Sequence, residues 1–363
     1  MRKKQVVLEK TSTMDSTIHQ DDEVILEVTN LNIHFPLEEG ILEAVSGVDF
    51  KLKKKKTLGI VGESGSGKSV ATKAILQIVD TPGKIADGDI LFRRHEKQEE
   101  IVNIAKLHPT GKEIRDIRGG EISVIFQEPM KAFSPIYTIG NQLVEAILLH
   151  VTKDEREAKK VAIDTLKKVG MSNPEQRMDQ YPHELSGGMR QRAMIAMSLC
   201  CNPAILIADE PTTALDVTVQ AQVLNLINQL KEDFNSAVIF ITHDLGVIAE
   251  MSDEVAVMYL GKVVEYTDVD TLFFGALHPY TQGLLRSIPT VGKANQPLES
   301  IEGIVPIPIN LPKGCGFYSR CQLAEDGLCN VADIPLVEVK DDHYVRCVKV
   351  NPNEREGGQK NGE

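Results

Sequence analysis

The sequence predicts an α/β fold with a parallel sheet, a helical insertion and a small C-terminal extension. Three short apolar runs, at 204–209, 237–242 and 254–259, are typical of fully buried parallel strands. Helical patterns lie between these runs, and this alternation places helices on the faces of the sheet. Residues 136–200 contain no convincing strand, so we expect a helical insertion there.

The first third of the chain predicts further elements of the same fold. Residues 1–22 are polar, and we expect a flexible tail. Residues 24–35 predict a strand, residues 57–76 predict a buried strand, a glycine-rich loop and a helix, and residues 121–126 predict another strand. The charged segment 93–120 is expected to be an irregular, exposed insertion.

Two further patterns organise the rest of the chain. The stretch KDEREAKKVAIDTLKKVG predicts an amphipathic helix that ends at Gly170. Its apolar face consists of Ala158, Val161, Ala162, Leu166 and Val169. After His278-Pro279 the sequence becomes rich in proline and contains cysteine, so we place a boundary near residue 275 and an extension over 276–363.

Composition excludes several classes of protein. The 363 residues carry 40 basic and 52 acidic side chains, a net charge of -12 that argues against a nucleic-acid binder. No run of about 18 apolar residues predicts a membrane span. The polar N-terminus lacks the apolar core of a signal peptide. We therefore expect a cytoplasmic location, where cysteines stay reduced.

The stretch GESGSGKS predicts a phosphate-binding loop. It matches the G-x-x-x-x-G-K-[ST] pattern between a strand and a helix, where backbone N–H groups can surround a phosphate at the positive end of the helix dipole. A lysine here reaches the β- and γ-phosphates, and the following hydroxyl can bind Mg²⁺. The residues expected to bind ATP in this loop are Gly62, Glu63, Ser64, Gly65, Ser66, Gly67, Lys68, Ser69 and Val70.

Four polar side chains follow strands of the same sheet. Asp209 and Glu210 end one buried strand, and we assign Asp209 to Mg²⁺ and Glu210 to the general base. Gln127 follows another strand and could bind Mg²⁺ or the attacking water. His243 follows a third and could bond the γ-phosphate. Taken singly, each would be an ordinary residue at a strand end, but parallel strand ends converge on one crevice.

The stretch LSGGMRQR predicts a second helix start suited to anions. Ser186 can cap a helix whose free N–H groups lie at Gly187, Gly188 and Met189. Because it belongs to the strand-free insertion, this helix start need not face the phosphate loop of its own chain.

In this order, GESGSGKS, IFQEP, LSGGMRQR, LIADEPTTALD and ITHD resemble the ATPase subunits of ABC transporters over roughly residues 23–270. The resemblance implies a P-loop NTPase with a RecA-like core, an antiparallel β subdomain and a helical signature subdomain over about 136–200, within an ATPase domain of 23–275. It also implies that two chains pack head to tail, so that Ser186 and its neighbours serve the partner's ATP.

Two more sites come with this resemblance. Ala214, Leu215 and Asp216 match the family loop that runs along the dimer interface, although they also suit the first turn of a helix. Phe35 occupies the place from which an aromatic ring stacks on adenine, a contact worth about 1–3 kcal/mol, although it could instead pack in the core.

Longer stretches are similar to the D-type ATPase of oligopeptide and dipeptide permeases: HELSGGMRQR, ADEPTTALDVTVQ, THDLGVIAE, VMYLGKVVE, HPYTQGLL and LPKGCGFYSRC. This similarity implies a paralogous ATPase partner, two transmembrane permease subunits, an extracellular substrate-binding protein and a location at the cytoplasmic face of the membrane. The lysine run before GESGSGKS and the long insertion depart from the family pattern. They leave an oligosaccharide or metal chelate open as cargo.

The six cysteines fall into two groups. Cys200 and Cys201 lie on an apolar helix face, where core packing is expected. The other four follow the spacing C-x5-C-x7-C-x17-C and predict a [4Fe-4S] site, since thiolates are soft ligands and the spacings exceed those of zinc knuckles. A subgroup of the permease ATPases carries such a cluster. Zinc, for which His343 could replace one thiol, and a tail without metal are the alternatives. These four residues are Cys315, Cys321, Cys329 and Cys347.

Other classes of protein fit the sequence less well. A soluble ABC ATPase of DNA repair or translation would carry two cassettes or a long coiled coil, whereas this chain has one cassette and no sustained heptads. A small-molecule P-loop kinase would lack LSGG. A redox protein based on the cysteines would leave the ATPase motifs unexplained.

Overall fold

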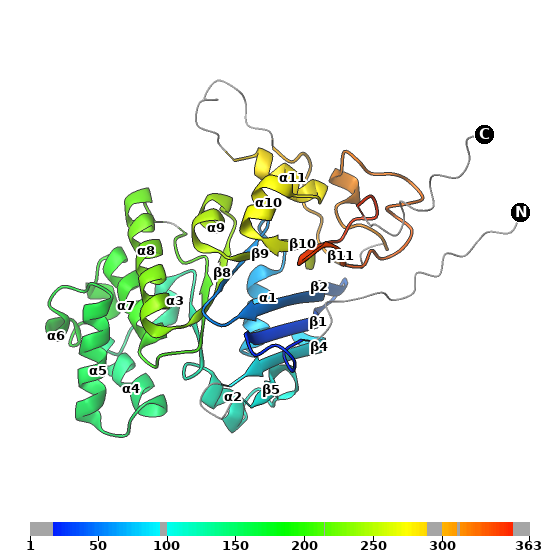
Figure 1. Ribbon diagram of the computed structural model, residues 1–363. Helices are drawn as coiled ribbons and strands as arrows, with labels where there is room; N and C mark the ends of the chain where they lie inside the picture. Colours follow the sequence, from blue (N-terminus) through cyan, green and yellow to red (C-terminus); the bar gives the residue numbers. More distant parts are fainter. Residues whose placement is uncertain (1–16, 95–99, 214, 289–299, 311–312, 351–363) are drawn as a thin grey trace, which may run out of the picture.

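The computed structural model describes residues 17–94, 100–213, 215–288, 300–310 and 313–350. Two sheets and a group of helices make up this part of the chain, as Figure 1 shows. The helices of the insertion stand apart on the left, the smaller sheet lies at the lower right, and the C-terminal segments lie above it. This arrangement confirms the predicted α/β class with an antiparallel part and a helical part.

The larger sheet has eight strands in the order β11-β12-β10-β9-β3-β8-β7-β6. Its central strands are parallel, because β3 pairs with β8 and β9 while β7 pairs with β6 and β8. Its strands are β3 (Thr57–Val61), β6 (Ile122–Ile125), β7 (Ile205–Asp209), β8 (Ala237–Thr242), β9 (Glu254–Tyr259), β10 (Lys262–Asp268), β11 (Val337–Lys340) and β12 (His343–Val345). The predicted buried strands at 204–209, 237–242 and 254–259 are therefore confirmed.

The smaller sheet is antiparallel, in the order β2-β1-β4-β5. Its strands are β1 (Val24–Leu37), β2 (Gly40–Lys53), β4 (Lys84–Arg93) and β5 (Ile101–Asn103). The sequence predicts only the first of these strands, since β2 and β4 carry polar residues and glycines inside their runs.

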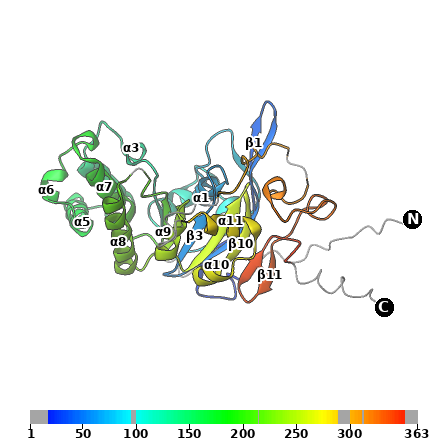
Figure 2. The same ribbon diagram turned by 90° about the horizontal axis from the view of Figure 1, so that it is seen from above.

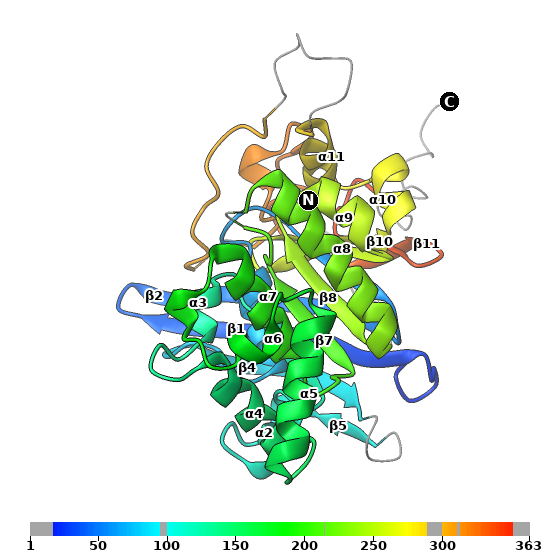
Figure 3. The ribbon, with the colours of Figure 1, turned by 90° about the vertical axis from the view of Figure 1, so that its left-hand side faces the viewer.

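Helices cover the larger sheet and fill the insertion. The helices of the insertion, which Figure 3 shows from their outer side, are α4 (Ile139–His150), α5 (Glu155–Lys168), α6 (Pro174–Arg177), η2 (Pro182–Glu184) and α7 (Gly187–Leu199). The others are α1 (Lys68–Ile75), η1 (Ile104–Lys106), α2 (Lys112–Ile117), α3 (Pro129–Ala132), α8 (Val217–Phe234), α9 (Leu245–Met251), α10 (Val269–Gly275), α11 (Pro279–Arg286) and η3 (Tyr318–Arg320). The amphipathic face predicted for α5 is buried except for Val161, which is half-buried, and Gly170 follows the helix with a φ of 71°.

Alternate residues of the parallel strands enter two separate cores. Ile205 and Ile207 of β7 pack toward α1 and the antiparallel sheet, whereas Leu206 and Ala208 pack toward α7 and α8. This is the period of two expected for a strand that is buried on both faces. The sheet is thus held between two apolar layers, with α1 on one face and the insertion on the other.

The expectation of an irregular, exposed segment over 93–120 is wrong for its described part. After residues 95–99, which lie outside the described part, the chain forms β5, η1 and α2. Ile104, Ile114 and Ile117 are fully buried in the core that also contains residues of the antiparallel sheet and of α1. The apolar residues are too few and too widely spaced to give a periodic signal, so the segment's burial depends on tertiary contacts.

Thr17 and Ile18, near the end of the segment expected to be a flexible tail, are held against β1. The backbone N–H groups of Thr17 and Ile18 donate to the Glu27 carboxylate at 3.0 Å each, and the Ile18 side chain is fully buried. Residues 1–16 of that segment lie outside the described part of the chain.

The C-terminal segments add to the edge of the larger sheet. Strand β12 pairs with β10 in antiparallel fashion and carries β11 beyond it. In Figure 2 these segments lie beside β10, on the side of the sheet away from the insertion. The buried Glu265 carboxylate of β10 accepts hydrogen bonds from Leu277 N at 2.7 Å, from His278 N at 3.1 Å and from His343 Nε2 at 2.8 Å. This carboxylate therefore joins β10, the start of α11 and β12.

His278 caps α11 in its neutral form. Its Nδ1 accepts from Tyr280 N at 3.1 Å, and burial lowers the pKa of this imidazole to about 4. Because the folded pKa lies below the ordinary value, the unfolded chain binds a proton that the folded chain does not as the pH falls from about 6.5 toward 4. Folding stability is therefore lost over this window.

We predict that His278→Gln reduces this acid sensitivity. Between pH 7.5 and pH 5 the parent should lose about 2 kcal/mol of unfolding free energy through this group, and the variant should not. Urea unfolding of both proteins at the two pH values measures the difference. Equal losses in parent and variant would contradict the prediction.

Candidate functional site

The loop between β3 and α1 depends on two glycines for its close packing. Gly67 precedes α1 with a φ of 95°, and a Cβ atom there would lie 2.4 Å from the Ala44 carbonyl oxygen. A Cβ atom on Gly62 would lie 2.1 Å from the carbonyl oxygen of Met258. Within α1, which is described throughout, no capping side chain and no acidic residue occupies the first turn. The N–H groups at its start are thus available to an anion.

Lys68 lies across this loop. Its ammonium donates to the carbonyl oxygens of Gly62 at 2.8 Å and Glu63 at 3.0 Å. Burial lowers the pKa of Lys68, and the charges of Glu210, Asp209 and Glu63 oppose that effect. The loop therefore holds a buried cation that is stabilised by the charges of three carboxylates.

Ser69 and Asp209 meet at the carboxyl edge of the parallel strands. The Ser69 hydroxyl donates to Asp209 Oδ1 at 2.8 Å across 140 positions of sequence. Burial raises the pKa of Asp209, the hydrogen bond from Ser69 lowers it, and the charge of Glu210 raises it further. The pair places a hydroxyl oxygen beside a carboxylate, the oxygen donors that Mg²⁺ prefers.

Glu210 is the centre of a second group of side chains. Its carboxylate accepts from Gln127 Nε2 at 2.9 Å and from Thr213 Oγ1 at 2.9 Å, and it lies 3.4 Å from His243 Nδ1. These residues come from the ends of β6, β7 and β8 and from the turn after β7. The structure thus brings the four side chains predicted at strand ends, Gln127, Asp209, Glu210 and His243, to one edge of the sheet.

The backbone at Glu210 is strained. Its φ is 44°, in the left-handed region, which costs a non-glycine residue on the order of 1–3 kcal/mol. Strand β7 ends just before this residue, and the Glu210 side chain is 17% exposed. Such residues are frequent where a side chain must be aimed at a reacting group.

The second helix start lies in the insertion. Ser186 caps α7, and its hydroxyl accepts from Met189 N at 3.4 Å, while Gly187 and Gly188 have open space around them. Figure 1 shows α7 with the helices on the left and α1 at the centre. The buried amide of Gln191, further along α7, donates to the Pro211 carbonyl oxygen at 2.6 Å. The helix is therefore tied to the turn that carries Glu210.

The remaining predicted residues have structural contacts. Phe35 is half-buried against the core of the antiparallel sheet, and its ring lies close to Gly83. Leu215 packs beside α8, and Asp216 caps that helix by accepting from Thr218 N at 3.1 Å and Val219 N at 3.0 Å. Ala214 lies outside the described residues.

Comparisons with known proteins identify the family. Residues 45–213 match the family model of the ABC transporter, and residues 264–329 match that of the oligopeptide/dipeptide transporter C-terminal region. The chain is 48% identical over 324 residues to the oligopeptide transport ATP-binding protein AppD of Bacillus subtilis, an alignment that covers 89% of this chain and 96% of that protein. The chain belongs to the ABC transporter family, among its oligopeptide transport ATP-binding proteins.

Other members of the ABC transporter family agree with this assignment. The oligopeptide transport ATP-binding protein OppD of Haemophilus influenzae is 45% identical, over 85% of this chain and 92% of that protein. A solved dimeric bacterial ABC transporter cassette is 25% identical, with a TM-score of 0.58 over 68% of this chain and 99% of that chain. A dimeric cassette bound to ADP and Pi has the same identity and coverage and a TM-score of 0.57. The chain is thus an ABC ATPase cassette that binds ATP.

The predicted [4Fe-4S] site is wrong. Among the residues that the structure describes, no group of three or more His, Cys, Asp or Glu side chains is placed to hold a metal ion, which also removes the zinc alternative. The descriptions of the two matched families, the ABC transporter and the oligopeptide/dipeptide transporter C-terminal region, name no metal centre. His343, the alternative ligand, instead bonds Glu265.

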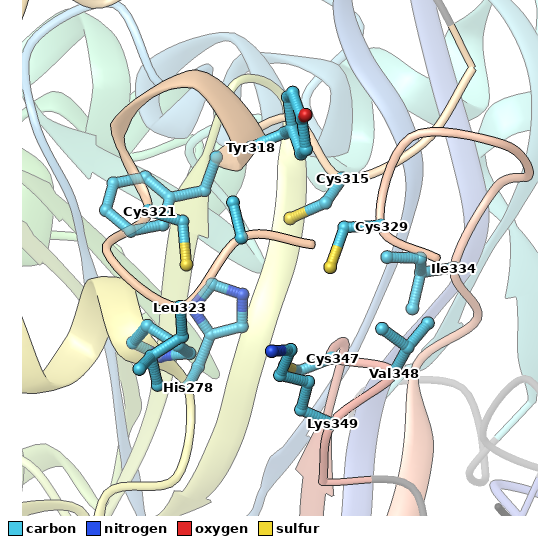
Figure 4. Close-up of a pocket in the computed structure, with 13 residues that line it drawn as sticks. His278, Cys315, Tyr318, Cys321, Leu323, Cys329, Ile334, Cys347, Val348 and Lys349 are labelled. Atoms are coloured by element: carbon cyan, nitrogen blue, oxygen red, sulfur yellow. The ribbon is translucent and has the colours of Figure 1, made fainter. Parts of the chain in front are cut away.

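The four cysteines line an apolar cavity, which Figure 4 shows together with His278. Burial raises the pKa of Cys315 to about 11, and it also raises the pKa of Cys321 and Cys347. In these surroundings the protonated thiol is the favoured form of these side chains. Cys329 is buried on the same cavity wall. All four cysteines therefore lie at one cavity of the extension. Cys200 and Cys201 are buried in the core of the insertion, as expected.

Three side chains of the site could not be found from local sequence patterns. Thr213, in the turn after β7, bonds Glu210. Tyr280 and Arg320 contact the phosphate-binding loop at Glu63, 217 and 257 positions away in the sequence. Both lie in stretches similar to the permease ATPases, HPYTQGLL and LPKGCGFYSRC, but nothing local indicates what they contact.

Proposed function

We propose that this chain is the ATP-hydrolysing subunit of an importer that takes up oligopeptides or dipeptides through partner membrane subunits. The meeting of Ser69 with Asp209 and of Glu210 with Gln127 beside the phosphate-binding loop supports ATP hydrolysis most directly. The match of residues 264–329 to the oligopeptide/dipeptide transporter C-terminal region, and relatives named for oligopeptide transport, support the cargo.

The proposed roles follow from the geometry of the loop and the strand ends. The loop N–H groups and Lys68 bind the phosphates. Glu210 accepts a proton from the attacking water, and Gln127 and Thr213 keep its carboxylate oriented. His243, which is 63% exposed beside Glu210, bonds the γ-phosphate. Phe35 stacks on adenine, and the half-buried position of its ring supports contact on one face.

Mg²⁺ fits the oxygen donors at the carboxyl edge of the sheet. Ser69 and Asp209 would hold it, with the amide oxygen of Gln127 as a further donor, and the bound ion would neutralise charge on the phosphates. The hydrogen bond of 2.8 Å between these two side chains keeps their oxygen atoms side by side.

The two anion-binding helix starts are proposed to act on one ATP from opposite subunits. Residues 186–189 cap the γ-phosphate of the partner chain's nucleotide, and the loop at 214–216 lines the interface. The open space around Gly187 and Gly188 supports close approach of a ligand, and similar cassettes have been solved as dimers. A paralogous ATPase is the proposed partner in this dimer.

The transport partners are proposed to be two transmembrane permease subunits and an extracellular substrate-binding protein, with this chain at the cytoplasmic face of the membrane. None of the described helices combines the length and apolar content needed to cross a bilayer. The ATPase domain is proposed to span 23–275 and the extension 276–363. Co-purification from detergent-solubilised membranes, with mass spectrometry of bound subunits and solute, tests both the partners and the cargo.

We predict that Glu210→Gln lowers ATP turnover by about 10²–10⁴ while ATP still binds, since the amide keeps the size of the side chain but cannot accept the proton. Lys68→Ala should instead weaken ATP binding itself. Steady-state hydrolysis and calorimetric titration measure the two effects. Glu250→Gln, the same change on the exposed side of α9, is the control. Turnover by Glu210→Gln within a factor of two of the parent would rule out the general base.

A second prediction concerns the helix start at Ser186, in the stretch LSGGMRQR. Ser186→Arg should leave the affinity of the isolated chain for ATP within about threefold of the parent, because this helix start serves the other subunit. Turnover and ATP-dependent dimer formation should be lost, since a bulky cation replaces the cap. Ser172→Arg, an exposed serine of the same insertion, is the control. A tenfold loss of ATP affinity in the isolated chain would show that the helix start at Ser186 acts on the ATP of its own chain.

A further inference from the structure

The carboxylate of Glu63, the second residue of the phosphate-binding loop, is paired with a residue of the C-terminal extension. Arg320 Nη1 donates to Glu63 Oε2 at 2.6 Å, and Nη2 donates to Oε1 at 3.0 Å. The pair is therefore bidentate, the strongest arrangement available to a guanidinium and a carboxylate. The Arg320 side chain is only 4% exposed.

Every N–H group of the Arg320 guanidinium has an acceptor. Besides the two bonds to Glu63, Nε donates to Glu302 O at 3.0 Å, Nη2 to Ile301 O at 3.2 Å and Nη1 to Tyr259 Oη at 3.3 Å. A guanidinium has five N–H groups in a fixed plane, so five acceptors determine its position completely. Arg320 thus joins the extension, the end of β9 and the phosphate-binding loop.

The backbone of Glu63 is held as well. Its N–H donates to the hydroxyl of Tyr280 at 2.9 Å, and its carbonyl oxygen accepts from Lys68. The Tyr280 ring is fully buried against Tyr259 and Phe317, with ring centroids 4.6 Å and 5.4 Å away. The amide, carbonyl and carboxylate of Glu63 are therefore all fixed, two of them by residues of the C-terminal region.

We propose that Arg320 is a positioning residue of the ATP site, which neutralises Glu63 and, together with Tyr280, fixes the phosphate-binding loop for nucleotide. This inference rests on the proposed ATPase function and assigns the C-terminal extension a part in it. The extension is then a structural part of the nucleotide site, in addition to any contact it makes with transport partners.

The electrostatic reason is the charge of the ligand. Glu63 belongs to the loop proposed to bind the phosphates, its carbonyl oxygen accepts from the Lys68 ammonium at 3.0 Å, and its charge acts on that ammonium. A carboxylate in this loop would repel a triphosphate, and in a partly buried site that repulsion is only weakly screened. Pairing with Arg320 removes the repulsion while leaving the loop's N–H groups free for the ligand.

A double-mutant cycle on the full chain distinguishes this role from one in which the Arg320–Glu63 pair only stabilises the extension. ATP affinity is measured by calorimetry for the parent, Arg320→Gln, Glu63→Gln and the double variant. Arg320→Gln should weaken ATP binding by about tenfold, because Glu63 is left unpaired. The double variant should return to within about threefold of the parent, because the repelling charge is gone. The loss in Arg320→Gln should also shrink at high salt.

Two further variants serve as controls. Arg320→Lys keeps the charge without the bidentate geometry and should give an intermediate affinity. Lys349→Gln breaks the Lys349–Glu325 pair, at 3.2 Å within the same extension, and should bind ATP like the parent. Thermal melting of each variant shows that it is folded at the assay temperature.

The outcomes distinguish this inference from the function on which it rests. If Arg320→Gln binds ATP within a factor of two of the parent, or if the double variant binds no better than Arg320→Gln, the positioning role is wrong and the ATPase function stands. A parent chain that does not bind ATP would overturn both.

Discussion

The parallel register of β3, β6, β7 and β8 is the constraint on which the site depends. Because these strands run the same way, their carboxyl ends lie at one edge, where β6, β7 and β8 place polar side chains and β3 leads into the phosphate-binding loop. Ser69 meets Asp209, and Glu210 meets Gln127, at this edge. Burial of both faces of the sheet keeps these strand ends fixed relative to one another.

The sequence predicts this part of the molecule well because its signals are local. An apolar strand followed by GESGSGKS and a helix needs no distant contact to be understood, and the same is true of the strand ends at Asp209 and His243. Strands β2 and β10 could not be predicted in this way, because they form by pairing with β1 and β9 and carry no clear local pattern of their own. The segment with Ile104 and Ile114 is missed for the same reason.

The cysteines mark the limit of arguments from spacing. The intervals between Cys315, Cys321, Cys329 and Cys347 suit a metal site, and the fold does bring the thiols to one cavity. Spacing does not reveal that this cavity is apolar, or that burial there favours the protonated thiol. Nor does it reveal the contact of Arg320 with Glu63, because an ion pair between residues so far apart in sequence has no local pattern.

The pairing of β12 with β10 has a consequence for how the chain could be divided. A chain cut after residue 275 would leave β10 as an open edge strand, with unpaired N–H and C=O groups that can recruit another chain. It would also leave the buried Glu265 carboxylate without the donors of Leu277, His278 and His343. The chain without its extension would thus carry an open strand edge that promotes aggregation, and β12 covers this edge in the full chain.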